Sequence, residues 1–264
     1  MKLRLLALVA AVCLMCCCTA CRVRVDLSGE QTDEDGSSAT TTTPPVNNDE
    51  MAAEAWNIYS RALDLESEYT TYELTYKARL TMGREQSVTN ARIVRIEEDG
   101  NATLLVESEV RGTYSSGYLK DGVGYFFKDG KKYWMPTDED GFFDTMGFTT
   151  TEPLTEEMFA TAIVMRDAAG GATVSCPLAA QYATDFAKMH LGSMAQVGTV
   201  SHAEAGVTVD AEGYPLTFTA AIEMQVAGYG AVTMQSENNY VAFGEDVVIT
   251  PPADLDEYMS IIDE

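Results

Sequence analysis

The stretch from Tyr72 to Met82 constrains the fold most, because its side chains alternate between apolar and polar. The apolar positions are Tyr72, Leu74, Tyr76, Ala78, Leu80 and Met82. Successive side chains of a β-strand point to opposite faces of the sheet, so this alternation predicts a long strand with one buried face and one wet face. Such a strand needs neighbours, and the chain must therefore build a sheet.

Short connections predict that this sheet is antiparallel. The turn at 98–101 separates strands expected at 86–97 and 102–112. A parallel crossover needs a dozen or more residues, which these connections lack. Further strands are expected at 116–120, 123–128, 132–135, 159–166, 172–176, 206–210, 214–227 and 231–242, with type I′ hairpin turns at Asp121-Gly122 and Asp129-Gly130.

Apolar residues spaced three and four apart predict helices at about 50–65, 178–190 and 254–262. The stretch 136–153 is expected to be an acidic loop in which Phe142-Phe143 packs back on the sheet. Its carboxylates lack the ligand series of an EF-hand, so we expect a solvated loop and no calcium site. Together these elements predict the α+β class.

The amino terminus predicts export and a lipid anchor. Lys2 and Arg4 precede an apolar run at 5–15 that is too short to span a bilayer comfortably, and we predict a cleaved signal peptide at 1–20. The apolar run leads to Cys18-Thr19-Ala20-Cys21. This pattern resembles a bacterial lipobox, although Cys18 stands where Leu is usual. Cys21 is therefore expected to be acylated, for example with palmitate. A plain secretory signal that is rich in cysteine is the alternative.

The segment at 21–48 is rich in Ser, Thr, Asp and Glu and predicts a disordered tether, because it cannot bury enough apolar surface to fold. One domain is expected at 49–264. Loss of Lys2 and Arg4 with the signal peptide changes the formal charge from −24 to −26. Such a surface argues against a nucleic-acid partner and against electrostatic docking on anionic headgroups. Membrane attachment then depends on the lipid.

No catalytic motif emerges from the residues. Nucleophilic catalysis needs a base beside the nucleophile, and neither His190 nor His202 stands in such a motif. Cys176 lies in a predicted strand, where an inert buried thiol is expected. Two isolated histidines do not predict a metal site either. We therefore expect neither an enzyme nor a bound cofactor or metal.

Aromatic residues on alternating positions of the predicted strands offer a ligand cavity. The candidate lining is Tyr72, Leu74, Tyr76, Tyr118, Tyr125, Phe127 and Trp134. The alternative is that these side chains simply fill the core.

Several features together resemble a known family. They are the lipobox, the acidic tether, the opening helix, the long alternating strand, the hairpin Tyr118-x-x-Asp121-Gly122-x-x-Tyr125 and the ending Pro252-x-Asp254-Leu255-x-x-Tyr258. Over residues 50–264 the chain resembles uncharacterised Gram-positive lipoproteins related to the LolA/LppX-type carriers. The resemblance implies an incomplete antiparallel half-barrel wrapped around two or three helices, with room for acyl chains between them.

Two functions are compatible with this reading. The first is a monomeric lipoprotein, anchored on the extracytoplasmic face of the cell membrane, that binds or carries a hydrophobic ligand without covalent chemistry. The second is a cell-surface interaction or structural module with a filled core that binds protein or glycan on its exposed sheet face. An apolar cavity of several hundred cubic ångströms would favour the first, and a close-packed interior the second.

Overall fold

The computed structural model describes residues 7–9, 48–151 and 154–261. Its main feature is one open sheet of twelve strands. In spatial order these are β14 (Met259–Ser260), β7 (Lys131–Pro136), β6 (Val123–Lys128), β5 (Thr113–Lys120), β4 (Asn101–Val110), β3 (Glu85–Glu98), β2 (Tyr72–Met82), β13 (Gly230–Phe243), β12 (Pro215–Val226), β11 (Gly198–Val209), β10 (Ala172–Pro177) and β9 (Ile163–Arg166).

Neighbouring strands of this sheet are antiparallel, except that β14 lies parallel to β7. The predicted antiparallel sheet that does not close is therefore confirmed. The predicted wrapping of a half-barrel around the helices goes beyond this arrangement and stays a prediction.

The tight turns of the meander follow from their sequences. Asp121 and Gly122 both have positive φ, 51° and 75°, and Asp129 and Gly130 repeat this pattern with 52° and 74°. Two successive residues with positive φ make the type I′ turn, whose twist matches that of the flanking strands. The hairpins predicted at both Asp-Gly pairs are thus present.

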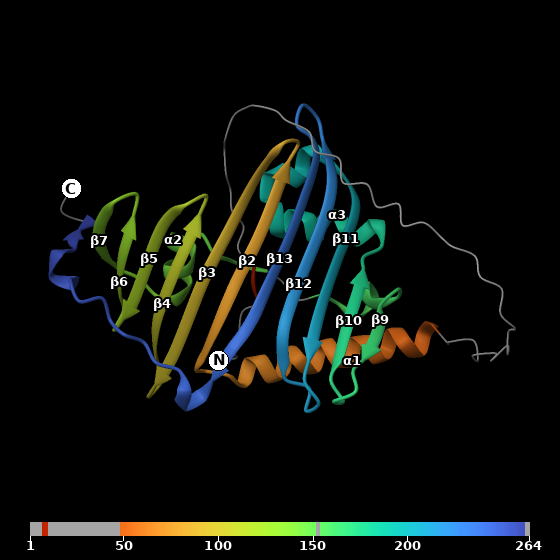
Figure 1. The fold of residues 1–264 in the computed structure, drawn as a ribbon, viewed down its shortest axis with the longest axis horizontal. Helices are drawn as coiled ribbons and strands as arrows, with labels where there is room; N and C mark the ends of the chain where they lie inside the picture. Colours follow the sequence, from red (N-terminus) through yellow and green to blue (C-terminus); the bar gives the residue numbers. More distant parts are fainter. Residues whose placement is uncertain (1–6, 10–47, 152–153, 262–264) are drawn as a thin grey trace, which may run out of the picture.

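Three α-helices accompany the sheet within the part of the chain that the structure describes: α1 (Asn48–Glu68), α2 (Glu139–Met146) and α3 (Ala180–Leu191). Short 3-10 helices are η1 (Glu156–Phe159), η2 (Gly192–Val197), η3 (Gly244–Asp246) and η4 (Leu255–Glu257). Figure 1 shows α1 crossing the strands near one end, with α3 and α2 behind the sheet. The helices predicted at 50–65 and 178–190 are confirmed as α1 and α3.

Four sequence-based predictions are wrong, and one of them is the start of the strand expected at 206–210, which is β11 and begins at Gly198. The loop expected at 136–153 contains α2, where the Asp138 carboxylate caps the helix by accepting a 2.9 Å hydrogen bond from the backbone N–H of Gly141. The closing helix at 254–262 is replaced by η4 and β14, because strand β7 offers unpaired backbone groups at the sheet edge. The strand expected from Phe159 begins only at Ile163, after η1.

A second, two-stranded ladder pairs β1 (Ala7–Val9) with β8 (Thr149–Thr151). β1 belongs to the predicted signal peptide and also lies close to β13 of the large sheet. The rest of the signal peptide, Cys21 and the tether as far as residue 47 fall outside the described residues. Helix α1 begins at Asn48, and the predicted division into tether and domain stays a prediction.

The helices and the sheet bury two large apolar clusters. One joins α1 and α3 to β9–β13, and the other joins α2 to β2–β6. Strand register places both on one side of the sheet, which we call the helix-facing face; the opposite side is the outer face. The hydrophobic side chains that are described as buried lie between Ala55 and Val247. The domain therefore contains its own core, and we expect it to fold without the signal peptide and the tether.

Arg95 of β3 connects both α2 and the segment just after α1 to the sheet. Its guanidinium is only 4% exposed and donates to the Glu139 carboxylate of α2 at 2.9 Å and to the Glu97 carboxylate at 2.8 Å. It also donates to the backbone carbonyl of Thr70, just after α1. One buried cation thus fixes α2 and the end of α1 against the same strand.

Replacing Arg95 should therefore be costly. Removal of one partner of a buried ion pair leaves uncompensated charge, so we expect Arg95→Ala to lower the free energy of unfolding by about 3 kcal/mol in urea titrations. Arg92→Ala is the matched control, since Arg92 pairs with Glu73 and Glu107 on the outer face of the same strand and is 37% exposed. It should cost about 1 kcal/mol or less. Equal costs would contradict the role of Arg95.

Candidate functional site: a cavity between the sheet and two helices

A small cavity lies between α1, α3 and the helix-facing face of β11, β12 and β13. Its volume is about 50 Å³. That is room for a few water molecules and far too little for an acyl chain. The lining residues are Tyr59, Glu66, Leu154, Phe186, Met189, His190, Ala205, Gly206, Phe218, Thr219, Ala220, Ser236 and Asn238.

The sheet side of the cavity is made by a row of small residues. Strand register places Cys176, Ala205, Ala220, Ser236 and Ala78 directly beside one another across β10, β11, β12, β13 and β2. We call them the small-residue row.

Larger side chains flank the small-residue row on both sides. Phe218 and Tyr76 stand in the next row along the strands in one direction, and Ile222, Met234 and Leu80 in the other. Directly opposite residues share a face, so the short side chains form a trough that runs across the strands.

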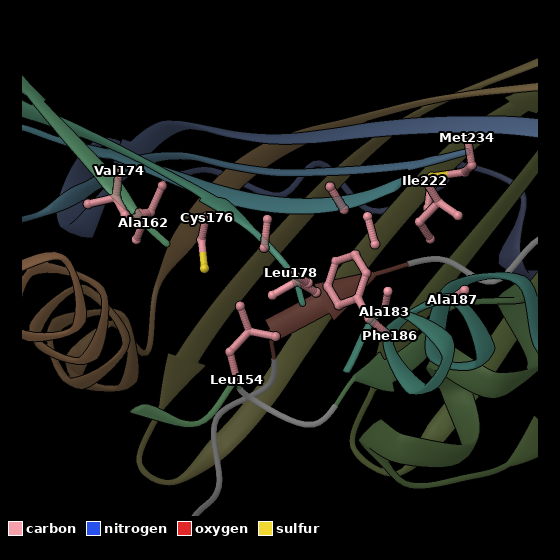
Figure 2. Close-up of a cluster of buried hydrophobic side chains, with 14 of the residues drawn as sticks. Leu154, Ala162, Val174, Cys176, Leu178, Ala183, Phe186, Ala187, Ile222 and Met234 are labelled. Carbon is pink, nitrogen blue, oxygen red and sulfur yellow. The ribbon is translucent and has the colours of Figure 1, made fainter. Parts of the chain in front are cut away.

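Helix α3 covers one part of this trough. Phe186, Met189 and His190 lie on one helix face because they are three and four residues apart. Figure 2 shows Phe186 projecting from α3 toward the strands. The Phe186 and His190 rings are 4.4 Å apart between centroids.

His190 is a buried polar group inside an apolar surrounding. It is 5% exposed, and its Nδ1 has no hydrogen-bond partner among the residues the structure describes. Burial lowers the pKa of His190 to about 4, so the imidazole is neutral at neutral pH. A neutral imidazole offers one donor and one acceptor, which makes His190 available to hydrogen-bond with a guest in the cavity.

Helix α1 contributes a second buried polar group. Tyr59, Ala62 and Glu66 follow one another at helical spacing on its buried face. The Glu66 carboxylate is 5% exposed and accepts a hydrogen bond from the Tyr240 hydroxyl. Burial raises the pKa of Glu66 to about 7, against the opposing effect of this hydrogen bond. Near neutral pH, Glu66 is therefore protonated in some molecules and ionised in the others.

The cavity contains polar groups but no fixed positive charge. No Lys or Arg occurs among its described lining residues. No group of three or more potential metal ligands occurs among the residues whose positions are described. Cys176 lies in the small-residue row but donates its thiol hydrogen to the Met158 carbonyl, and burial raises the pKa of Cys176 to about 12. The arrangement can hold a guest by hydrogen bonds and apolar contact.

Strand β1 occupies the same side of the sheet. It pairs with β8 and lies close to β13, which carries Ser236 of the small-residue row. In Figure 1 it is the short red segment behind β2 and β13, and in Figure 2 the red strand crosses the region of Leu154, Leu178 and Phe186. This short extended strand, Ala7–Val9, thus lies on the same side of the sheet as α2 and α3, next to β13.

The residues proposed from the sequence as a cavity lining are divided between two faces. Tyr72, Leu74 and Tyr76 are buried on the helix-facing face, in the cluster that includes Phe142 and Phe143. They lie beside the cavity and do not line it.

The remaining proposed residues lie on the outer face. Tyr118 stands opposite Leu105 and Tyr125, and Trp134 stands opposite Tyr125. Phe127 lies two residues from Tyr125 on β6, so it points to the same face, and it packs against the exposed Tyr114. Alternation along a strand shows which side chains share a face of the sheet, but it does not show which face is turned toward the helices. The sequence-based prediction therefore combined aromatic residues from both faces into one lining.

Sequence reasoning missed Glu66, His190 and Ser236 as members of one site. A signal was present, since each occupies an apolar position of its own helix or strand pattern. A polar residue on a buried face indicates either a satisfied core group or a binding site. Their common location could be seen only once the strand order was known.

No family model matches the chain, and no curated protein sequence matches it. Among solved structures it is similar to the Mycobacterium tuberculosis lipoprotein LppX, with a TM-score of 0.37 and 11% identity over 75% of this chain and 99% of LppX. A LolA superfamily protein from Nitrosomonas europaea gives a TM-score of 0.27 and 7% identity over 74% and 97% of the two chains. A putative outer membrane lipoprotein-sorting protein domain from Vibrio parahaemolyticus gives a TM-score of 0.26 and 11% identity, over 76% of this chain and 95% of that domain.

These matches name the same group of proteins as the resemblance stated from the sequence. Likeness with such low TM-scores carries no inference about ligand or activity. The expected Gram-positive origin stays a prediction. Among the described residues no helix is both long and apolar enough to cross a membrane.

Glu66 and His190 should give the stability of the domain opposite dependences on pH. Glu66 binds its proton more tightly in the folded state, so its ionisation lowers stability by about 3 kcal/mol as pH rises from 4.5 to about 7. His190 binds its proton less tightly in the folded state, so stability is lost as pH falls from 6.5 to about 4. Between pH 4.5 and 6.5 the two effects oppose each other. Tyr59, Tyr72 and Tyr240 also face Glu66 but stay neutral in this range.

We expect Glu66→Gln to match the wild type at pH 4.5 and to exceed its free energy of unfolding by about 3 kcal/mol at pH 8. Urea titrations at pH 4.5, 6 and 8 would measure this. Glu68→Gln, at an exposed position near the end of the same helix, should leave the profile unchanged. A Glu66→Gln profile that parallels the wild type would show that Glu66 ionises freely in the fold.

Proposed function

We propose that the mature protein is an extracytoplasmic lipoprotein that binds or carries a hydrophobic ligand, such as an acyl chain, between the sheet and α1 and α3. One observation carries this proposal: the extended strand β1 lies against β13 on the side of the sheet that carries the helices. This side of the sheet therefore has room for an extended chain, and an acyl chain is another extended chain.

Processing supports this proposal. The cavity measures about 50 Å³ in the chain that includes β1. Cleavage after residue 20 would remove β1 and leave its space beside β13. Apolar surface exposed in this way favours a ligand, since burying it gains about 25 cal/mol per Å². The ligand would thus take the place that the signal peptide leaves.

The chemistry of the interior supports binding without catalysis. Cys176 is a neutral thiol because burial raises its pKa to about 12, and the buried His190 Nδ1 has no hydrogen-bond partner among the described residues. A half-barrel wrapped around the helices, as the sequence resemblance implies, would keep such an apolar layer away from water.

The charge of the chain supports attachment through lipid. At a formal charge of −26 after processing, the mature protein is repelled by anionic headgroups. Acylation of Cys21 would supply the anchor, and the segment at 21–48 would hold a monomeric domain clear of the membrane surface. We therefore place the protein on the extracytoplasmic face of the cell membrane.

A second function, a surface interaction module, is favoured by the aromatic residues of the outer face. Tyr114 is 48% exposed, and half-buried Tyr125 contacts Tyr258 with ring centroids 5.7 Å apart. The small volume of the cavity also favours a filled core. In this alternative the outer face of β5–β7 would bind protein or glycan.

Native mass spectrometry of residues 22–264, purified without detergent, tests the first function. A co-purified ligand of lipid mass is the expected result. A domain that is always ligand-free, and that takes up no added lipid, would leave the interaction module as the better reading.

Filling the trough should abolish ligand binding. Ala220→Leu places a larger side chain on the small-residue row, so we expect the co-purified lipid to disappear while the free energy of unfolding changes by no more than about 1–3 kcal/mol. Ala221→Leu is the matched control, because the neighbouring side chain points to the outer face. Retention of lipid by Ala220→Leu would place the ligand elsewhere.

The anchor has its own test. In cells fed a palmitate analogue that can be detected by coupling to a dye, Cys21→Ser should lose all label, because no other cysteine is expected to become the acylated amino terminus. Cys18→Ser, three residues upstream, should keep it. Equal labelling of the two variants, or an unlabelled wild type, would support the plain secretory signal.

A further inference from the structure

The polar groups of the cavity indicate what kind of ligand it accepts. The cavity has apolar walls from Phe186, Met189 and Phe218, and polar atoms from Glu66, His190, Ser236 and Asn238 enter the same small space. A purely apolar ligand would leave the unpartnered Nδ1 of His190 facing hydrocarbon, which costs free energy. A ligand with a polar group at the right place would avoid that cost.

His190 is the strongest single indication. Its side chain is 95% buried, and Nδ1 has no partner among the described residues although the side chain lines the cavity. Buried polar atoms in folded proteins are nearly always hydrogen-bonded, so an unpartnered atom at a cavity wall indicates a guest molecule or a bound water. The small-residue row provides the space in front of it.

The charges of the cavity decide the class of that guest. A buried phosphate or carboxylate needs a cation or several N–H donors, and the described lining contains no Lys or Arg. The only ionisable carboxyl there, Glu66, would repel an anion whenever it is ionised. A quaternary ammonium group could pack on the aromatic lining residues Tyr59, Phe186 and Phe218, but it has no N–H or lone pair with which to bond the unpartnered Nδ1 of His190. An uncharged polar group is the remaining match.

Resting on the proposed function, we infer that the ligand is an uncharged amphiphile whose hydroxyl group hydrogen-bonds with His190 and Glu66 while its hydrocarbon chain lies along the small-residue row. Neutral imidazole accepts from or donates to a hydroxyl, and Glu66 can do the same in its protonated form and accept in its ionised form. Long-chain alcohols and acylglycerols with a free hydroxyl belong to this class. Phospholipids and ionised fatty acids do not.

The test compares ligands of equal chain length that differ only in the polar group. Residues 22–264 are loaded with the neutral fluorescent probe N-phenyl-1-naphthylamine, which is then displaced by dodecane, 1-dodecanol or dodecanoate at pH 7.5. We expect 1-dodecanol to bind about tenfold more tightly than dodecane, the effect of one well-made hydrogen bond, and dodecanoate to bind more weakly than 1-dodecanol.

Variants assign the effect to His190. His190→Leu should remove the preference for 1-dodecanol over dodecane, and His190→Asn, which keeps a polar atom near the position of Nδ1, should restore part of it. His202→Leu is the matched control, because His202 is exposed on β11 near Glu204. If His190→Leu does not fold, Ser236→Ala provides a second, milder change of the same polar end and should weaken the preference.

The outcomes separate the two proposals. Equal binding of dodecane and 1-dodecanol by the wild type would overturn the inference, show that the cavity holds water only at His190, and leave the hydrophobic binder standing. Tightest binding of dodecanoate would also overturn it. Failure of the probe and of every ligand to bind would overturn the proposed function itself.

Discussion

The large sheet must bury one face along most of its width, and this constraint shapes the rest of the molecule. Strands β2, β13 and β12 alternate in phase, so their inward residues form continuous rows across the sheet. Helix α1 packs near β9–β12, α3 on β11 and α2 on β5. Between them, the small-residue row borders the cavity of about 50 Å³ that the helix side chains leave unfilled. The cavity thus arises mainly from the sizes of side chains on the sheet and the helices, with Leu154 of the loop before η1 also in its wall.

Two buried ionisable groups, Glu66 and His190, are held neutral or partly neutral within this apolar layer by the same cause, their burial. Such groups lower stability at one end of the pH range or the other, and an apolar pair of similar size would fold at least as well. Their presence inside the trough is therefore hard to attribute to stability alone. Arg95 differs, because its carboxylate partners Glu97 and Glu139 offset its burial, and its bonds to Glu139 and to the Thr70 carbonyl join α2 and the segment after α1 to the sheet.

The sheet was largely predictable, and the site was not. Period-two alternation at Tyr72–Met82 and the two Asp-Gly turns are local signals, and β2 and β6 have the predicted bounds. Helix α2 was missed although Asp138 and Gly147 are ordinary start and stop residues, because its acidic first turn resembled a solvated loop. The meeting of Glu66, His190 and Ser236 depends on strand order and on how α1 and α3 cross the sheet. Neither follows from the pattern of any single segment.

Open sheets end in edges, and both edges of this one are short. The outermost strands, β14 and β9, have two and four residues, and Arg166 of β9 is paired with Glu54 of α1. A second copy that approached either edge would find few backbone groups to bond with and charged side chains close by. Each edge therefore offers only a short ladder for pairing with another sheet.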